Sequence, residues 1–205
     1  MAEPAPADAD HRKRQPRGDA RRQQIIDAAI ELFAAKGFRG TGLAALAEQV
    51  GVTAPALLYH FGTKDRLLRE VVEQRQVDER AALAAVPEPE VGVGQLHAVV
   101  RRTVEQSVLS RLYVVLGAEN LDPGDPLHEF FVGRYDQARR AVRHGLALDE
   151  RHGTVRAGLD VEQLAIEVVA TLIGLEVQWL TDPTAFDLIA VVDAYVDRLL
   201  QELAP

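Results

Sequence analysis

The sequence predicts an all-α protein. Apolar residues recur every three or four positions in successive stretches, as they do on the buried face of an amphipathic helix. No stretch alternates apolar and polar residues like a half-buried strand, and glycine or proline separates one helical pattern from the next. The chain has 205 residues, of which 47% are hydrophobic, so it is long enough to bury a sizeable core.

The N-terminal residues 1–18 are rich in alanine, proline and charge and have no apolar period, which predicts a disordered arm. Six basic residues lie in this arm or just after it: Arg12, Lys13, Arg14, Arg17, Arg21 and Arg22. Such a cluster can follow a DNA backbone or enter a minor groove. A solubilising tail without any contact to DNA is the alternative that the composition leaves open.

Three helices are predicted within residues 19–64. The first covers 19–36 and ends at Gly37, and Thr41 can cap the second. A tight turn containing glycine leads to a short third helix, which Thr53 can cap. Two short helices joined in this way are typical of a helix-turn-helix unit, and the first helix supplies the apolar face that buries both.

The remainder of the chain, residues 65–205, is predicted to form a second, helical domain. Thr63 can cap its first helix, and proline or glycine punctuates the helices that follow. The predicted helices cover about 63–86, 93–120, 127–151, 160–181 and 184–203.

Charge is distributed unevenly along the chain. The formal net charge is −8, yet residues 11–69 carry 11 Lys and Arg against 5 Asp and Glu, whereas residues 71–205 carry 12 against 22. A basic end beside an acidic body is the arrangement expected of a phosphate-binding domain on a solvated, repelled body.

Several classes of function are excluded or disfavoured. The chain has no cysteine, which excludes disulfides, thiolate nucleophiles and Cys-based zinc or iron–sulfur sites. No phosphate loop, nucleophile elbow or helical zinc motif is present, the six histidines have no metal-ligand spacing, and residues 92–97 form a linker, not a dinucleotide fingerprint. The sequence therefore predicts no enzyme, no cofactor and no metal. The N-terminus is polar and no apolar run reaches about 18 residues, which favours a cytoplasmic protein without a membrane partner.

One stretch, residues 24–68, resembles the DNA-binding domain of the TetR family. The residues that carry the resemblance are Ile26, Ala28, Ala29, Leu32, Phe33, Gly37, Phe38, Thr41, Leu46, Ala47, Gly51, Val52, Thr53, Leu57, His60, Phe61, Thr63, Lys64, Asp65 and Leu68. They cover about the first third of the chain. The resemblance implies a three-helix DNA-binding head, a helical effector-binding body and a homodimer, acting as a repressor that a small molecule releases from a palindromic operator.

The third helix of such a unit lies in the major groove, while helix ends and basic side chains contact phosphates. The residues expected in the groove are those that point away from the core face of Leu57 and Phe61, namely Thr53, Ala54, Pro55 and Tyr59, with His60 beside them. Phosphate contacts are expected from Thr41, Lys64 and Arg39. Each of these residues could instead only cap a helix, pack or be solvated.

The third helix is also notable for what it lacks. Residues 54–60 contain no Arg, Lys, Asn or Gln, the side chains that form paired hydrogen bonds to guanine or adenine. We therefore expect sparse direct readout of bases, with specificity from thymine methyl contacts and DNA shape.

The last two predicted helices carry apolar stripes that resemble the dimerisation face of the family, where two copies form a four-helix bundle. The predicted interface residues are Leu164, Val168, Leu172, Leu175, Trp179, Phe186, Ile189, Val192, Val196 and Leu199. Ala170 and Gly174 are small enough to let helices approach closely.

Polar residues among apolar ones in the body are candidate contacts for an effector of unknown identity: His97, Gln106, Tyr113, Asn120, His128, Arg134 and Tyr135. Residues of these types are more often surface residues or satisfied core residues. A helical ligand-binding or adaptor protein without DNA binding is the alternative function, because Leu58 occupies the position where TetR-family members usually have a tyrosine.

Overall fold

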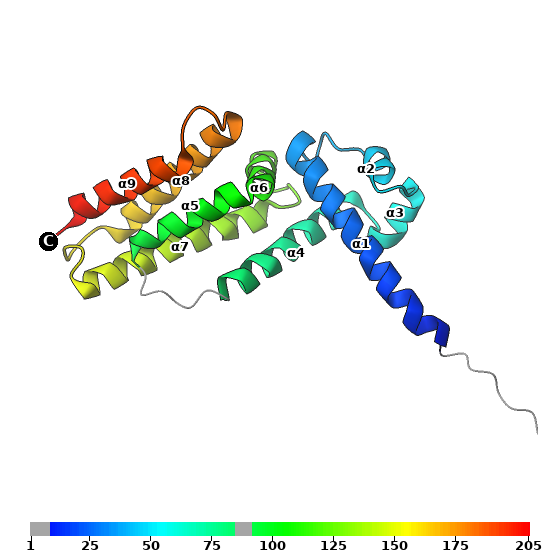
Figure 1. Cartoon of the computed structure of the whole chain (residues 1–205), viewed down its shortest axis with the longest axis horizontal. Helices are drawn as coiled ribbons and strands as arrows, with labels where there is room; N and C mark the ends of the chain where they lie inside the picture. The colour runs from blue at the N-terminus through cyan, green and yellow to red at the C-terminus, as the bar shows by residue number, and fades with distance from the viewer. Residues whose placement is uncertain (1–8, 85–91) are drawn as a thin grey trace, which may run out of the picture.

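The computed structural model describes residues 9–84 and 92–205 (Figure 1). Within these two ranges the regular structure consists of nine α-helices and one short 3-10 turn, and no strand is present. The all-α prediction is therefore confirmed.

The N-terminal head is formed by α1(Ala9–Lys36), α2(Leu43–Gln49), α3(Ala54–Phe61) and the first half of α4(Lys64–Ala84). In Figure 1, α2 and α3 lie together on one side of the long α1. The three-helix unit is held by an apolar core in which Phe33, Leu57 and Phe61 are fully buried. Burial of such large side chains is the main stabilising contribution to a small helical unit.

The body comprises η1(Val93–Gln95), α5(Leu96–Glu105), α6(Ser107–Glu119), α7(His128–His152), α8(Val161–Thr181) and α9(Leu188–Leu203). Helix α7 packs along α8, and α5 packs along α9. The head rests on the body mainly through the contact of α1 with α6. One apolar cluster joins head and body, because Leu112, Leu116 and Phe131 of the body belong to the same core as the buried residues of α1.

The first boundary to correct lies in the N-terminal arm. Residues 9–18 form the first turns of α1, where the sequence predicts a disordered arm, while residues 1–8 lie outside the described part of the chain. Alanine, arginine, lysine and glutamine favour helix, and extending an existing helix avoids the cost of nucleating a new one. The prediction of disorder was based on the alanine, proline and charge of this segment and on its lack of an apolar period, none of which prevents such an extension of α1.

The predicted single helix over 93–120 is broken into η1, α5 and α6. The break falls at Gln106, whose φ of −113° and ψ of 42° are not helical. The hydroxyl of Ser110 donates a hydrogen bond to the carbonyl of Thr103 (3.2 Å) and so provides a partner at the break. Because no glycine or proline marks this position, periodicity alone could not locate it.

The helix caps follow the prediction at two sites and differ at one, and the start of α9 differs as well. Thr53 accepts a hydrogen bond from the amide of Ala56 (3.3 Å), and Thr63 accepts one from the amide of Arg66 (3.1 Å), as predicted for α3 and α4. Helix α2 begins after Gly42 and has no side-chain cap. Helix α9 begins at Leu188, later than predicted, because the carboxylate of Asp187 accepts from two amides of its first turn.

Candidate nucleic-acid interface and ligand pocket

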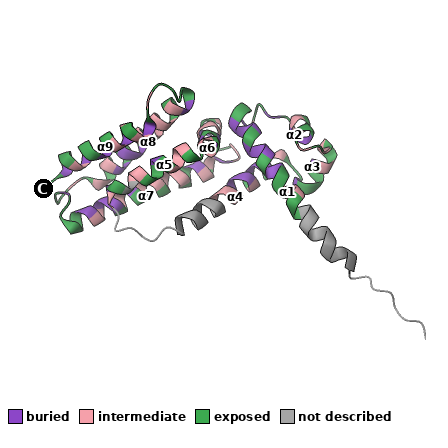
Figure 2. Ribbon diagram, in the orientation of Figure 1, coloured by how far each residue is buried: buried purple, intermediate pink, exposed green. Residues whose placement is uncertain are grey.

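One face of α3 is anchored in the head and the opposite face is open to solvent (Figure 2). Leu57 and Phe61 are fully buried, whereas Tyr59 is 88% exposed. Thr53, Pro55 and His60 are exposed as well. The exposed face of α3 therefore carries four of the five residues that the sequence predicts for the groove. A large aromatic side chain so fully exposed has little role in folding and is available for recognition.

Two residues of α3 differ from the prediction. Ala54 is half-buried and packs against the core of the head, so it does not point away from that core as predicted. Leu58, which was not among the predicted site residues, is 37% exposed and adds an apolar group to the open face. Relative to the prediction, the open face of α3 loses the methyl group of Ala54 and gains the larger apolar side chain of Leu58.

The turn between α2 and α3 is held from α1. The guanidinium of Arg21 donates to the carbonyl of Gly51 (3.1 Å), and Gly51 has a φ of +65°, which a glycine adopts without strain. Arg22 pairs with Glu70 of α4 and lies 5.3 Å from the ring centroid of Phe61. Arg21 and Arg22 therefore form contacts within the head. They are less available for the contact with DNA that is predicted for the basic cluster. The side chains of Arg12, Lys13, Arg14 and Arg17 lie outside the described part of the chain.

Thr41 and Lys64 are used inside the head. Thr41 is 2% exposed and its hydroxyl donates to the carbonyl of Gly37 (2.7 Å), so the predicted phosphate contact is wrong. The ammonium of Lys64 donates to the carbonyl of Phe38 and lies 4.1 Å from the centroid of its ring. Burial lowers the pKa of Lys64, although the carboxylates of Glu119 and Asp65 act in the opposite direction. An ammonium that donates to a carbonyl and packs on an aromatic ring is poorly placed to contact a phosphate.

Arg39 also differs from the prediction. Its guanidinium donates to the carbonyl of Glu119 (3.1 Å) and to the carboxylate of Asp125 (2.9 Å), so it links the head to the body. Other exposed cations of the described head are Lys36, Arg66 and Arg69, none of which was predicted as a site residue. These are the better candidates for phosphate contacts.

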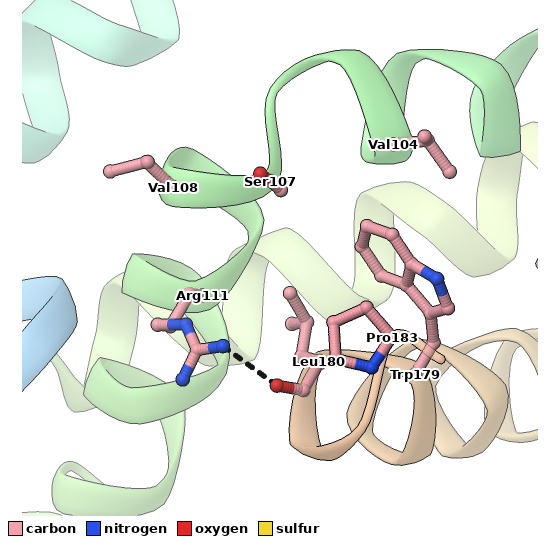
Figure 3. Close-up of a pocket in the computed structure, with 7 residues that line it drawn as sticks. All are labelled: Val104, Ser107, Val108, Arg111, Trp179, Leu180 and Pro183. Atoms are coloured by element: carbon pink, nitrogen blue, oxygen red, sulfur yellow. Dashed lines mark hydrogen bonds between the residues drawn. The ribbon is translucent and has the colours of Figure 1, made fainter. Parts of the chain in front are cut away.

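A pocket of about 300 Å³ opens between the α5–α6 break and the C-terminal end of α8 (Figure 3). Its walls are mostly apolar, with two polar side chains, and they comprise Val104, Ser107, Val108, Arg111, Trp179, Leu180 and Pro183. The break at Gln106 brings the end of α5 and the start of α6 to the same pocket. Arg111 ties α6 to α8 by donating to the carbonyl of Leu180 (2.7 Å). The volume of the pocket lies at the small end of the range for ligand sites.

None of the seven predicted effector residues is among the residues that line this pocket. His97 pairs with Asp193 of α9, and Gln106 forms the break itself. Asn120 is buried and joins α6 to the next loop, because its amide donates to the carbonyl of Leu116 (2.8 Å) and its oxygen accepts from the amide of Leu127 (2.9 Å). These side chains hold the body together.

The other predicted effector residues belong to an aromatic cluster or to the start of a helix. The guanidinium of Arg134 lies 3.9 Å from the ring centroid of Tyr113. Tyr135 packs at an angle against Phe131, with 6.2 Å between the ring centroids. His128 is the first residue of α7. Tyr113, Arg134 and Tyr135 therefore take part in packing between α6 and α7, and none of the four lines the pocket.

Glu176 is a functional candidate that the sequence analysis missed. Burial raises the pKa of Glu176, while a hydrogen bond with Ser110 and the charge of Arg134 act in the opposite direction. It lies one helical turn before Trp179 and Leu180, so a half-buried carboxyl group adjoins the pocket wall. An acidic residue within the apolar stretch of α8 was the available signal.

The predicted dimer stripe is largely internal to the monomer. Val168, Val192, Val196 and Leu199 are buried, because α8 packs on α7 and α9 packs on α5. Leu164, Leu172, Leu175, Trp179, Phe186 and Ile189 are half-buried against the same cores. The four buried residues therefore already have partners within one chain, and for the six half-buried residues the interface stays a prediction.

A different face of α8 is uncovered. It carries Ile166, Ala170, Gly174 and Val177, with Ile166 48% and Val177 39% exposed. Helix α8 is long and apolar enough to span a membrane by length and composition alone, and only 22% of its most apolar 18-residue window is buried. An apolar helix that its own chain covers so little can pack against a helix of another chain.

Two family models match the chain. The model described as bacterial regulatory proteins, tetR family, matches residues 25–71, and the model described as BetI-type transcriptional repressor, C-terminal, matches residues 93–201. The chain belongs to the TetR family. It is accordingly a DNA-binding transcriptional regulator, a class of protein that is not enzymatic.

Relatives of this TetR-family regulator cover nearly its whole length. ArpR and TtgR, both transcriptional regulators of Pseudomonas putida, are each 28% identical over 190 residues, which is 89% of this chain and 90% of theirs. A TetR-family regulator of Agrobacterium tumefaciens superposes with a TM-score of 0.75 at 16% identity, over 92% of this chain and 100% of its own. SmeT in its complex with triclosan has a TM-score of 0.71 at 22% identity, over 91% and 92%. These two structures have the same fold.

Proposed function

We propose that the protein represses transcription by binding a palindromic operator as a homodimer, and that a small apolar or amphipathic molecule releases it from the DNA. The observation that carries the DNA-binding part is the open face of α3, with Tyr59 88% exposed beside a buried anchor of Leu57 and Phe61. Binding to chromosomal DNA implies a cytoplasmic protein.

The open face of α3 supports a particular way of recognising DNA. The hydroxyls of Thr53 and Tyr59 and the imidazole of His60 can contact base edges, and Pro55 and Leu58 can contact thymine methyl groups. Lys36, Arg66 and Arg69 supply phosphate contacts that position the head without selecting a sequence. Specificity then depends on few base contacts, on DNA shape and on the symmetry of the operator.

Replacing Tyr59 with alanine is expected to weaken binding to the protein's own upstream DNA about tenfold, because one base contact contributes about 1 to 3 kcal/mol. Binding to random DNA of equal length should change little. Replacing Lys36 with alanine should weaken both complexes alike and reduce the dependence on salt, since one counterion fewer is released. Gel-shift titrations at several fixed salt concentrations measure both effects.

Two results of these titrations would contradict the proposal. Equal losses on operator and random DNA for the Tyr59 variant would mean that α3 does not select the sequence. A wild-type protein that binds upstream and random DNA with the same affinity would favour a helical ligand-binding protein without DNA recognition.

The pocket supports the effector part of the proposal. Its mostly apolar walls suit an apolar or amphipathic molecule, and the structurally similar SmeT is known in a complex with triclosan. Ser107 and Arg111 of the pocket belong to α6, whose other end meets the head. Helix α6 has 13 residues, about 20 Å of rigid helix, so a displacement at the pocket reaches the head directly. A ligand shifts the operator equilibrium only by its difference in affinity for the two states.

Trp179 is the only tryptophan of the chain and lies in the pocket wall, so its fluorescence is expected to change when an effector binds. We expect a screen that starts with triclosan to find a compound that alters this emission and weakens operator binding. Replacing Ser107 with leucine fills the pocket and should abolish both responses, whereas Thr154→Leu in the exposed α7–α8 loop should preserve them. A compound that releases the operator without changing the Trp179 emission would contradict this assignment of the pocket.

Homodimerisation is the third part of the proposal and is supported by the uncovered stripe of α8. Ala170 and Gly174 lie one turn apart on this stripe. Apart from the backbone of α8 itself and the two neighbouring residues, no described residue lies within 4 Å of a Cβ added to Gly174. Small residues let two helices approach closely, and a pair of copies related by two-fold symmetry matches a palindromic operator.

A further inference from the structure

Glu119, the last residue of α6, forms hydrogen bonds with the turn that follows α1. One carboxylate oxygen of Glu119 accepts a hydrogen bond from the amide of Phe38 (2.6 Å), and the other accepts from the amide of Arg39 (3.2 Å). Each oxygen thus satisfies one backbone donor of the head. Hydrogen bonds from amides to a carboxylate are shorter and stronger than those between neutral groups, and a pair of them adds geometric specificity.

The turn is shaped to receive this carboxylate. Gly37 has a φ of +74°, and a Cβ at this position would lie 2.4 Å from an oxygen of Glu119, so only glycine leaves room. Arg39 closes the contact from the other side by donating to the carbonyl of Glu119 (3.1 Å) and the carboxylate of Asp125 (2.9 Å). Lys64 binds the carbonyl of Phe38 and carries the charge that complements Glu119.

Elsewhere the contact between α1 and α6 is made by apolar side chains of the shared core. Apolar contacts are not directional and fix the rotation of one helix on another only loosely. The paired bonds of Glu119 are directional, and they lie at the rim of this contact.

We infer that Glu119 is a positioning residue for operator binding: its carboxylate fixes the orientation of the head on the body. This inference rests on the proposed function. In a dimer the orientation of each head sets the separation of the two α3 helices, and the half-sites of an operator accept only one separation. Glu119 itself lies on the body side of the head–body contact, at the C-terminal end of α6.

The test measures head orientation and operator affinity in the same variants. Glu119→Gln keeps the size of the side chain but replaces one acceptor oxygen with an NH₂ donor that faces a backbone N–H. The matched control is Glu129→Gln, at an exposed position in the first turn of α7. Because the chain has no cysteine, spin labels can be placed at Glu48→Cys on α2 and Gln137→Cys on α7, both exposed. Excess unlabelled protein restricts the measured distances to one chain.

We expect the distribution of head–body distances to broaden in Glu119→Gln and operator affinity to fall about tenfold, whereas Glu129→Gln should match the wild type. An unchanged distance distribution, or an unchanged operator affinity, would overturn the inference. The distance measurement needs no DNA, so it tests the contact even if the wild type binds no operator, which would be a failure of the proposed function alone.

A second pair of variants approaches the same contact from the head. Gly37→Ala adds a Cβ that collides with Glu119, and Gly153→Ala adds one at a similar φ of +72° after α7, where nothing lies within 4 Å. Both variants carry the same left-handed backbone strain at the end of a helix. Broader distances and weaker operator binding in Gly37→Ala alone would support the inference, and equal behaviour of the two variants would overturn it.

Discussion

Replacing Gly174 with glutamate is expected to convert the proposed homodimer into monomers. The substitution places a charge in the centre of the uncovered stripe of α8, where desolvating it against an apolar partner is costly. Operator affinity should fall about 100-fold, the lower end of the range for losing bivalent binding. Analytical ultracentrifugation at micromolar concentration measures the first effect, and gel-shift titration measures the second.

The matched control is Gly133→Glu on α7. Gly133 is exposed, whereas Gly174 is half-buried, but both are helical glycines with no described residue beyond their own helix within 4 Å of an added Cβ, so the change in helix propensity and charge is the same. It should remain dimeric. A wild-type protein that sediments as a monomer, or a Gly174→Glu variant that sediments as the wild type does, would contradict the proposed interface. Charges at Leu172 or Leu175 would be less informative, because both side chains pack in the core of the monomer.

Replacing Gly92 with alanine is expected to destabilise the protein by about 3 kcal/mol, at the upper end of the usual cost of overpacking. A Cβ at this position would lie 1.6 Å from a carboxylate oxygen of Asp149. Asp149 is 8% exposed and accepts a hydrogen bond from the amide of Val93 (2.7 Å). The added methyl group must displace this carboxylate and leave a buried charge without its donor.

Gly94→Ala is the control for this substitution. It lies two residues further along η1, and nothing lies within 4 Å of its added Cβ. Urea unfolding at neutral pH should show a lower midpoint for Gly92→Ala and little change for Gly94→Ala. Equal midpoints for the two variants would show that the backbone at Gly92 moves aside at little cost, and that this close contact is not a constraint on the fold.

The head was predicted well because its signals are local. Thr53 and Thr63 cap helices through amides three residues away, and the apolar period placed Leu57 and Phe61 on the buried face of α3. Such contacts lie within one or two turns of helix, so spacing in the sequence reports them. The same logic failed at Gln106, where the α5–α6 break has no local marker.

The predicted sites were less accurate because contacts with residues distant in sequence determine which interactions a polar side chain forms. Lys64 and Arg39 looked free to contact phosphates, yet one binds Phe38 and the other Asp125, 86 residues away. The stripe on α8 and α9 was correctly identified as apolar, but α5 and α7 cover much of it. Likewise, the walls of the pocket come from α5, α6, the end of α8 and Pro183, and no single segment carries their pattern.

The sequence by itself determined the all-α class, the helix-turn-helix and the open face of α3, since each follows from side-chain periodicity and from spacing within a short segment. The resemblance of residues 24–68 to known DNA-binding domains indicated the family. Only the tertiary structure decided which cations remain exposed, where the pocket lies, which face of α8 is uncovered and how Glu119 holds the head. Those features depend on which surfaces the packing of helices has already covered, and a residue's own neighbours in the chain do not carry that information.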